Sequence, residues 1–387
     1  MRVALLSDVY FPRVNGVSTS IETFRRELPG FGVQTLLVAP TYGGESAAPD
    51  LIRLPARPVP RDPEDRLMGY RAALALEQRL RDEAVDLIHI QTPFVAHYAG
   101  LRLARRLKLP VLATYHTLFE EYLHHYLPVA PSGALRGIAR RLSRGQCNAL
   151  DRVIVPSQAM AKRLASYGVT TRREILPTGI PCAQFAGGNG AGFRQRLGIS
   201  PTRPVALYVG RVAFEKNISF LIEATDRARA TLPDVLLLIA GEGPARAALA
   251  AQVAARGLGE NVRFLDYLDR STELPDCYAA ADLFVFASRT ETQGLVLLEA
   301  LAAGTPVLAL AEMGTAEILA PGEGTVTSPD DPIAFASLMA DLLTDRAWLA
   351  ALARAAPTHA SRWSDQGLAG RLAHLYSDVL AGHAPRN

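Results

Sequence analysis

Short apolar runs alternate with amphipathic stretches along almost the whole chain. Apolar runs bounded by turn residues predict buried strands, and apolar positions repeating about every 3.6 residues predict helices. Strands are expected at residues 2–7, 33–39, 86–90, 110–114, 152–155, 174–176, 205–209, 235–240, 262–265, 283–287 and 307–310. Helices are expected at residues 17–28, 65–81, 95–107, 157–167, 218–230, 244–256, 272–279, 295–303, 332–343 and 348–355.

Repeated strand–helix units of this kind predict an α/β fold with parallel sheets covered by helices on both faces. Because 387 residues are too many for one such core, two tandem Rossmann-like domains are expected. Their expected bounds are 1–185 and 195–363, with the glycine-rich stretch 182–194 interpreted as a linker. A further helical stretch, 364–380, is one helix too many for the second sheet. Ligands bind beyond the carboxyl ends of such strands, so a site in a cleft between the domains is expected.

Composition and charge exclude several classes of protein. A net charge of +3 is too small to indicate binding to nucleic acid. The three cysteines are widely spaced and form no metal-binding pair, which favours a reducing compartment. The chain shows no signal-peptide pattern and no uncharged apolar run of the ~18 residues that span a bilayer. A cytoplasmic protein is expected, and peripheral attachment to the inner face of the cell membrane stays open.

Residues 290–306 carry the clearest chemical pattern. A helical pattern begins at Gly294, with the carboxylate of Glu291 before it and that of Glu299 inside it. A helix N-terminus presents N–H groups and a partial positive charge, which suit a phosphate. The stretch therefore suits a ligand with a central diphosphate and a hydroxyl-bearing ring at each end, such as a nucleotide-sugar. The alternative is an ordinary strand–loop–helix unit with solvated glutamates.

Three other loops that follow strands carry candidate residues. Arg211 and Lys216 straddle the turn after residues 205–209 and suit a diphosphate, although most charged loops are only solvated. Asn15 and Gly16 can take positive φ and bring the backbone close to a ligand, although a plain turn is the more common case. His116 follows the strand 110–114, although a lone histidine is more often structural. The sequence has no G-x-G-x-x-G turn, nucleophile elbow or P-loop, so phosphate binding without a metal or other cofactor is expected.

Together these motifs resemble the family 4 retaining glycosyltransferases, which have the two-domain GT-B architecture. The resemblance rests on residues 15–16, 175–180, 210–217, 291–299, 304–307 and Trp363. It implies a hexosyltransferase whose two domains face each other across a cleft and whose last helix, within 364–387, crosses back to the first domain. It also implies retention of configuration by same-face attack, with the departing phosphate as the base.

The resemblance further implies a role for each matching residue. Arg211 and Lys216 would bind the diphosphate, Gly294 and Leu295 would donate backbone N–H groups to it, and Gly16 would approach it from the first domain.

At the two ends of the donor, Glu299 would bind the ribose hydroxyls, and the catalytic residues Glu291 and His116 would contact the sugar. The residues expected near the nucleotide base are Phe264, Asp266 and Tyr267. The aspartate departs from the glycine that is frequent in the family, and this leaves the base undetermined.

Two basic stretches, 98–110 and 128–150, bear on the acceptor because neither contains an acidic residue. In the second, Leu135, Ile138 and Leu142 share one helical face, and the expected membrane or acceptor contacts are Arg136, Arg140, Arg141 and Arg144. Such a helix suits an anionic membrane, whereas an ordinary surface helix would pack its leucine face on the core. Residues 115–128 and 290–295 resemble those of diacylglycerol glucosyltransferases and related lipid mannosyltransferases.

The expected reaction is therefore transfer of a hexose from a nucleotide-sugar donor, UDP-glucose, to a lipid such as diacylglycerol. A GDP-mannose-dependent mannosyltransferase acting on a glycolipid or polysaccharide precursor is the nearest alternative. A sugar-nucleotide epimerase and a non-catalytic nucleotide-sugar binder are the alternatives from other classes.

Overall fold

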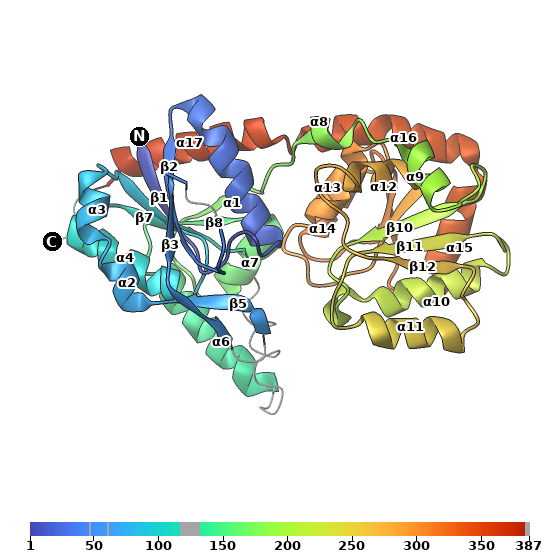
Figure 1. Cartoon of the computed structure of the whole chain (residues 1–387), viewed down its shortest axis with the longest axis horizontal. Helices are drawn as coiled ribbons and strands as arrows, with labels where there is room; N and C mark the ends of the chain where they lie inside the picture. The colour runs from blue at the N-terminus through green and yellow to red at the C-terminus, as the bar shows by residue number, and fades with distance from the viewer. Residues whose placement is uncertain (46–47, 60–61, 117–131, 384–387) are drawn as a thin grey trace. The chain divides into compact units, whose positions relative to one another are not determined.

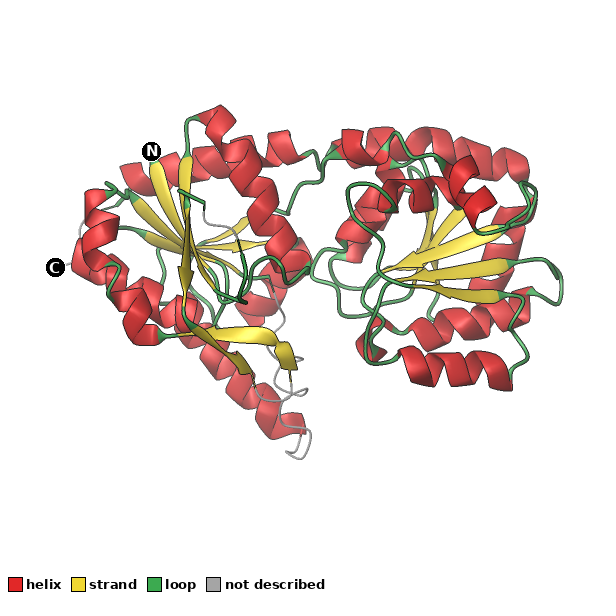
Figure 2. Cartoon of the chain, in the orientation of Figure 1, coloured by secondary structure: helices red, strands yellow, loops and turns green. Residues whose placement is uncertain are grey.

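The computed structural model describes residues 1–45, 48–59, 62–116 and 132–383 (Figure 1). The chain forms two compact units. Unit 1 comprises Met1–Gly179 and Asp365–Asn387, and unit 2 comprises Ile180–Ser364. Each unit is a parallel sheet with helices on both faces (Figure 2), as the strand–helix pattern predicts.

In unit 1 the sheet has the strand order β3-β2-β1-β6-β7-β8-β9. Its strands are β1 Arg2–Leu6, β2 Gln34–Pro40, β3 Leu51–Leu54, β6 Leu87–Ile90, β7 Val111–Thr114, β8 Arg152–Val155 and β9 Arg173–Ile175. The helices are α1 Gly16–Glu27, α2 Tyr70–Leu74, α3 Glu77–Asp82, α4 Val95–Leu107, α6 Ser132–Cys147, α7 Gln158–Ser166, α17 Asp365–Ala381 and the 3-10 helix η1 Leu28–Phe31.

In unit 2 the order is β12-β11-β10-β13-β14-β15. The strands are β10 Val205–Val209, β11 Leu236–Ala240, β12 Val262–Leu265, β13 Leu283–Phe286, β14 Val307–Leu310 and β15 Thr325–Ser328. The helices are α8 Cys182–Phe185, α9 Gly190–Arg196, α10 Ile218–Ala228, α11 Arg246–Ala255, α12 Leu274–Ala280, α13 Leu295–Ala302, α14 Thr315–Leu319, α15 Pro332–Thr344, α16 Arg346–Ser361 and the 3-10 helix η2 Phe214–Lys216.

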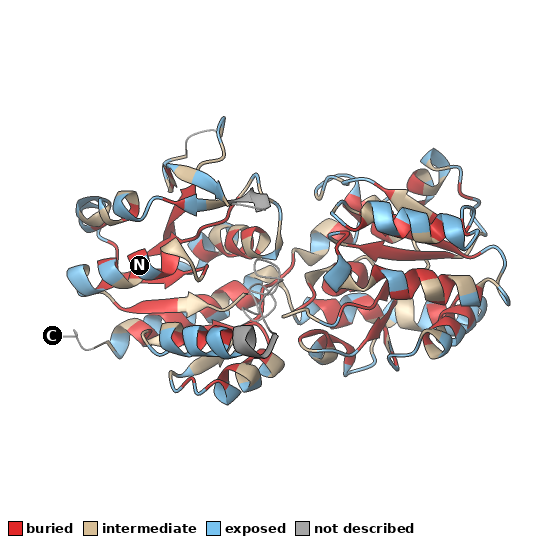
Figure 3. Cartoon of the chain, turned by 90° about the horizontal axis from the view of Figure 1, so that it is seen from below, coloured by how far each residue is buried: buried red, intermediate tan, exposed pale blue. Residues whose placement is uncertain are grey.

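The strand β6 at the centre of the first sheet and the central strands of the second sheet are buried along their whole length (Figure 3). Every residue of β10, β11, β13 and β14 is buried. A strand covered on both faces has no polar side to alternate with, which explains why these strands are continuous apolar runs in the sequence. Each sheet thereby holds the loops at its carboxyl edge on a rigid base.

The helix expected at residues 65–81 is wrong at its start and is confirmed, as two short helices, over the rest of the range. The structure has a two-stranded antiparallel hairpin, β4 Ala56–Val59 and β5 Asp62–Met68, followed by the short helices α2 and α3. Gly69 ends the hairpin and stands as the N-cap of α2. The strand β5 pairs only with β4, outside the main sheet, so its sequence lacks the apolar run that identifies the other strands.

The glycine-rich stretch 182–194 is not an open linker. It forms α8 and the start of α9, which contact α12 and α13. Side chains at Gly188 and Gly190 would place Cβ 2.2 Å from backbone oxygens of Pro275 and Ala279 in α12. The glycines are thus required for close packing, and the segment belongs to unit 2.

The last helix, α17, belongs to unit 1, as the resemblance predicts. It packs on α1 and η1, where Gly370 admits the ring of Phe31. Within unit 1 the hydroxyl of Tyr376 lies 2.7 Å from Nδ1 of the buried His89 in β6. Among the helices that the structure describes, none is both long and apolar enough to cross a bilayer.

Candidate active site

The loop after β10 brings two oppositely charged candidates together in unit 2. Lys216 Nζ lies 2.6 Å from Glu291 Oε1, and both side chains are about four-fifths buried, with exposures of 22% and 21%. Asn217 takes a left-handed conformation at φ 56° and donates its side-chain amide to the carbonyl of Ala287 at the end of β13. Arg211 is exposed on the same loop. The loop therefore presents one cation to solvent and holds a second against the carboxylate.

The loop that carries Glu291 is fixed by close backbone contacts. Gly294 is the N-cap of α13 at φ 91°, a conformation that favours glycine. Gly314 donates its N–H to the carbonyl of Glu291, and a Cβ there would lie 2.0 Å from the carbonyl oxygen of Thr292. The start of α13, with Leu295 as its first residue, is thus held in place, and a helix N-terminus is a position that suits an anion.

Glu299 lies within α13 and is fully buried. Its Oε1 lies 2.5 Å from a guanidinium nitrogen of Arg270, and its Oε2 accepts a 2.9 Å hydrogen bond from the hydroxyl of Tyr278. A buried carboxylate requires such partners, because an unpaired charge costs several kcal/mol when it leaves water. Arg270 has no motif in the sequence, so sequence reasoning missed it.

Two of the residues expected near the base, Phe264 and Asp266 at the end of β12, contact Arg246 at the start of α11. The Arg246 guanidinium lies 5.5 Å from the ring centre of Phe264 and forms a 3.0 Å ion pair with Asp266. Tyr267 is more than half exposed. The aspartate thus has an intramolecular partner, and the exposed ring of Tyr267 leaves an aromatic surface for stacking.

In unit 1, Gly16 is the first residue of α1, and the side chain of Asn15 caps this helix by accepting from Ser18 N at 2.9 Å. The positive φ expected for this turn is wrong, since Asn15 has φ −157° and Gly16 is not among the residues with positive φ. A Cβ at Gly16 would meet no atom within 4 Å. The fold therefore does not require glycine at this position.

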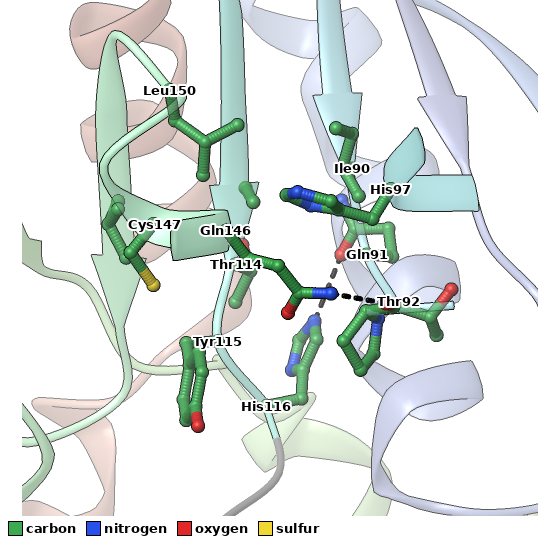
Figure 4. A pocket seen from close by; sticks show the side chains of 13 residues that line it. Ile90, Gln91, Thr92, His97, Thr114, Tyr115, His116, Gln146, Cys147 and Leu150 are labelled. Carbon is green, nitrogen blue, oxygen red and sulfur yellow. Dashed lines mark hydrogen bonds between the residues drawn. The ribbon is translucent and has the colours of Figure 1, made fainter. Parts of the chain in front are cut away.

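His116 follows β7 and lines a pocket with Gln91, Thr114 and Gln146 (Figure 4). Its Nε2 lies 2.9 Å from the side-chain oxygen of Gln91, so Nε2 carries the proton and Nδ1 is the acceptor. Burial lowers the pKa of His116 to about 4, and the ring is neutral at pH 7. A neutral imidazole suits a hydrogen bond to a sugar hydroxyl better than proton donation.

The same pocket contains His97, which sequence reasoning missed because it lies on the apolar face of α4. It is 3% exposed, and its Nε2 has no hydrogen-bond partner among the residues that the structure describes. Burial lowers its pKa to about 4 as well. The pocket is thus lined by two neutral imidazoles and two amides, which suit a neutral, hydroxyl-bearing group.

The helix α6 buries small residues and exposes large ones. Ala139, Ser143 and Cys147 are buried, whereas Ile138 and Leu142 are 53% and 38% exposed. The alternative in which the large apolar face packs on the core is therefore wrong for these two residues. The arginines at 140, 141 and 144 are exposed, while Arg136 and Leu135, like His124 and His125, lie outside the residues whose side chains the structure describes.

Two doubly wound units, the second with cations and carboxylates on the loops after its strands, define a glycosyltransferase of the GT-B type. Residues 14–184 match the family model described as Glycosyltransferase Family 4, and residues 191–359 match the one described as Glycosyl transferases group 1. The chain belongs to glycosyltransferase family 4 and is a hexosyltransferase. This assignment removes the support for an epimerase or a non-catalytic binder.

The chain is similar to several characterised proteins. It is 35% identical to the alpha-monoglucosyldiacylglycerol synthase of Streptococcus pneumoniae, over 80% of this chain and 71% of that protein. It is 30% identical to the GDP-mannose-dependent alpha-mannosyltransferase of Mycobacterium tuberculosis, over 83% of this chain and 82% of that protein. Among solved structures, sucrose-phosphate synthase from Thermosynechococcus elongatus covers 98% of this chain and 99% of its own, with a TM-score of 0.81 and 24% identity, which shows the fold.

Proposed function

We propose that the protein is a retaining, metal-independent glucosyltransferase that moves glucose from UDP-glucose to a lipid such as diacylglycerol at an anionic membrane surface. The observation that carries the lipid assignment is the exposed apolar and basic surface of α6. The similarity to an alpha-monoglucosyldiacylglycerol synthase supports the same acceptor class.

Unit 2 supplies the groups that a nucleotide-sugar needs. Arg211 and Lys216 neutralise the diphosphate, and the start of α13 at Gly294 and Leu295 accepts its oxygens. Two cations and a helix N-terminus provide the neutralisation that a metal ion gives in other enzymes, so transfer is expected to persist in a chelator. Glu299 binds the ribose, and Phe264, Asp266 and Tyr267 lie on the base side.

For the reacting sugar, unit 2 offers the carboxylate of Glu291 and unit 1 offers the ring of His116, and Gly16 of unit 1 is the residue proposed for the diphosphate. Glu291 is paired with Lys216 and therefore acts as an acceptor for sugar hydroxyls, not as a general acid. The chain offers the sugar a neutral His116. Because Lys216 holds the carboxylate of Glu291 and the low pKa of His116 makes its ring a weak base, we assign the departing phosphate as the base that takes the proton from the acceptor hydroxyl on the same face.

The surface of α6 suits a lipid acceptor because it combines two kinds of attraction. Ile138 and Leu142 would insert into the interface, and the arginines at 140, 141 and 144 would lie against anionic headgroups, each contributing about 1 kcal/mol. A protein that binds the membrane in this way reaches its substrate without a spanning helix. We therefore place it as a peripheral protein on the inner face of the membrane.

The test is a donor panel of UDP-glucose, UDP-galactose and GDP-mannose with diacylglycerol in vesicles that contain anionic lipid. Mass spectrometry identifies the glycolipid, and digestion with anomer-specific glycosidases reports its configuration. We expect α-linked glucosyl diacylglycerol from UDP-glucose, formed equally with and without EDTA. A β-linked product, or a requirement for a divalent metal, would contradict the proposal.

A GDP-mannose-dependent mannosyltransferase is the second candidate. The similarity to the mycobacterial mannosyltransferase supports it, and the Arg246–Asp266 pair at the base side leaves the choice of base open. The same donor panel separates the two candidates, because a product formed from GDP-mannose and not from UDP-glucose would favour the mannosyltransferase.

A further inference from the structure

The carboxylate of Glu299 is completely covered in unit 2. Its exposed fraction is 0%, and both oxygens are hydrogen-bonded within the protein. A ribose diol cannot reach either oxygen unless one of these partners leaves. The ribose site proposed for Glu299 is therefore occupied by the protein's own side chains.

The two partners differ in their freedom to move. Tyr278 is fully buried in α12, and its ring packs on Phe185 and Phe284 with centroids 5.8 Å away in each case. Arg270 lies in the loop between β12 and α12, and its side chain is 28% exposed. The tyrosine is fixed by the core, so the arginine is the partner that can leave.

The loop fixes the backbone of Arg270 and leaves its side chain able to change partners. Asp269 accepts hydrogen bonds from the backbone and hydroxyl groups of Ser271 and Thr272, and Gln184 donates to the carbonyl of Arg270. The guanidinium itself rests 5.5 Å from the ring centre of Phe185 and makes one ion pair. A long side chain on a fixed turn exchanges partners without a change in the fold.

We propose that Arg270 forms an ion pair with Glu299 until the nucleotide binds. The ribose hydroxyls then replace the guanidinium as partners of the carboxylate. The arginine is a positioning residue: it holds the buried carboxylate in place, and the cost of displacing it lowers the apparent affinity for the donor. The inference rests on the proposed function, in which Glu299 binds the ribose of a nucleotide-sugar. It predicts that the arginine competes with the 2′-hydroxyl and not with the base or the diphosphate.

The test compares UDP with 2′-deoxy-UDP, which share the base and the diphosphate and differ in one ribose hydroxyl. Their Kd values are measured by calorimetry on the full chain, without acceptor, for wild type, Arg270→Ala, Arg270→Gln and Glu299→Gln. We expect Arg270→Ala to bind UDP about five- to tenfold more tightly while 2′-deoxy-UDP changes less, because the hydroxyl no longer competes with a charged hydrogen bond. Glu299→Gln should lose most of the preference for UDP.

Arg270→Gln keeps a hydrogen-bond donor and removes the charge, so it preserves the test if the alanine variant folds poorly. It should raise the preference for UDP by a smaller factor than alanine. If the Arg270 variants bind UDP and 2′-deoxy-UDP equally more weakly than wild type, the arginine contacts the base or the phosphate directly. If the Kd values do not change, the ion pair is purely structural. Either result contradicts the proposed exchange and leaves the proposed function standing. If wild type binds neither UDP nor GDP, the proposed function fails and the exchange fails with it.

Discussion

At the scale of single residues, Lys216 and Glu291 form an ion pair in which their charged atoms lie 2.6 Å apart. A diphosphate would give the lysine a second anionic partner, so its loss should weaken donor binding directly. We expect Lys216→Ala to raise the Kd for the donor about 10- to 100-fold, the value of one hydrogen bond between charged groups. Calorimetry with UDP measures this, with the exposed Lys162→Ala as the matched control; equal Kd values in the two variants would remove Lys216 from the site.

A substitution at Gly16 should change donor affinity without lowering the free energy of unfolding. Alanine fits without steric contact at the start of α1, so Gly16→Ala should leave the free energy of unfolding unchanged or raise it by about 0.5 kcal/mol. Donor affinity should nevertheless fall several-fold, because the added methyl group would separate the backbone from the diphosphate. Gly30→Ala, which also meets no atom within 4 Å, is the control. Unchanged donor affinity in Gly16→Ala would show that no ligand approaches this position.

How far the sequence predicts the site also depends on the residue. The order of strands and loops places Glu291 and Glu299 near the carboxyl edge of one sheet, and this follows from the apolar pattern alone. The ion pairs with Lys216 and Arg270 do not follow from it, because they depend on the conformation of loops that have no periodic pattern. His97 was missed for a different reason, because its apolar neighbours on the helix α4 indicate only a core position.

At the scale of elements, the proposed membrane binding rests on α6. We expect Arg141→Glu/Arg144→Glu to reduce binding to vesicles with anionic lipid by tenfold or more, since each cation contributes about 1 kcal/mol near such a surface. Flotation at low and high salt measures the effect, and binding should become less salt-dependent. Circular dichroism should show an unchanged fold.

The exposed apolar residues of α6, Ile138 and Leu142, are tested by a separate double variant. Ile138→Ser/Leu142→Ser should weaken flotation with both anionic and neutral vesicles, because it removes buried apolar area rather than charge. Ile333→Ser in unit 2 is a matched control, since Ile333 is 61% exposed on α15. If the control and the double variant float equally well, α6 does not insert.

The start of α4 contains a titratable contact. Asp8 is 3% exposed, and its Oδ2 accepts from Thr92 Oγ1 at 2.7 Å and from Ala96 N at 3.0 Å. Burial raises its pKa from 3.8 to about 6, so the native state retains a proton that the unfolded chain has lost between these pH values. The stabilisation is full below about pH 4 and is lost as the pH rises to about 6.

Asp8→Asn removes this titration while keeping the hydrogen-bond acceptor. The free energy of unfolding of wild type relative to the variant should therefore fall by up to about 3 kcal/mol between pH 4 and pH 6, and stay constant above pH 7. Urea denaturation at several pH values measures it. A difference that is flat across this range would show that Asp8 has an ordinary pKa.

Elements differ in how well the sequence predicts them, for a physical reason. The strands β10, β11, β13 and β14 are buried on both faces, and that burial requires the apolar runs from which they are predicted. The hairpin β4–β5 lies outside the main sheet and carries charged residues, so its sequence contains neither period. The glycines of 182–194 fit a flexible linker as well as they fit close packing, so the sequence alone does not separate the two.

At the scale of the whole molecule, the chain returns to unit 1 only through α17, after unit 2 is complete. Tyr376 of this helix contacts His89 in the central strand β6, and the other ring nitrogen of His89 lies 2.7 Å from the hydroxyl of Thr114 in β7. Burial holds the pKa of His89 well below its usual value, so one nitrogen donates and the other accepts. The last helix is thus connected to the centre of the first sheet.

Tyr376→Phe removes one hydroxyl and leaves a buried ring nitrogen of His89 without a partner. This should lower the stability of unit 1 by about 1–3 kcal/mol, the usual cost of an unsatisfied buried polar group, and leave unit 2 unchanged. Hydrogen exchange separates the units: the amides of β6 and β7 should exchange faster, and those of β10 and β11 at the wild-type rate. Tyr70→Phe is the control, because this tyrosine is 42% exposed. Faster exchange in both sheets would mean that the two units unfold together, and α17 would then stabilise the whole chain instead of the unit that contains it.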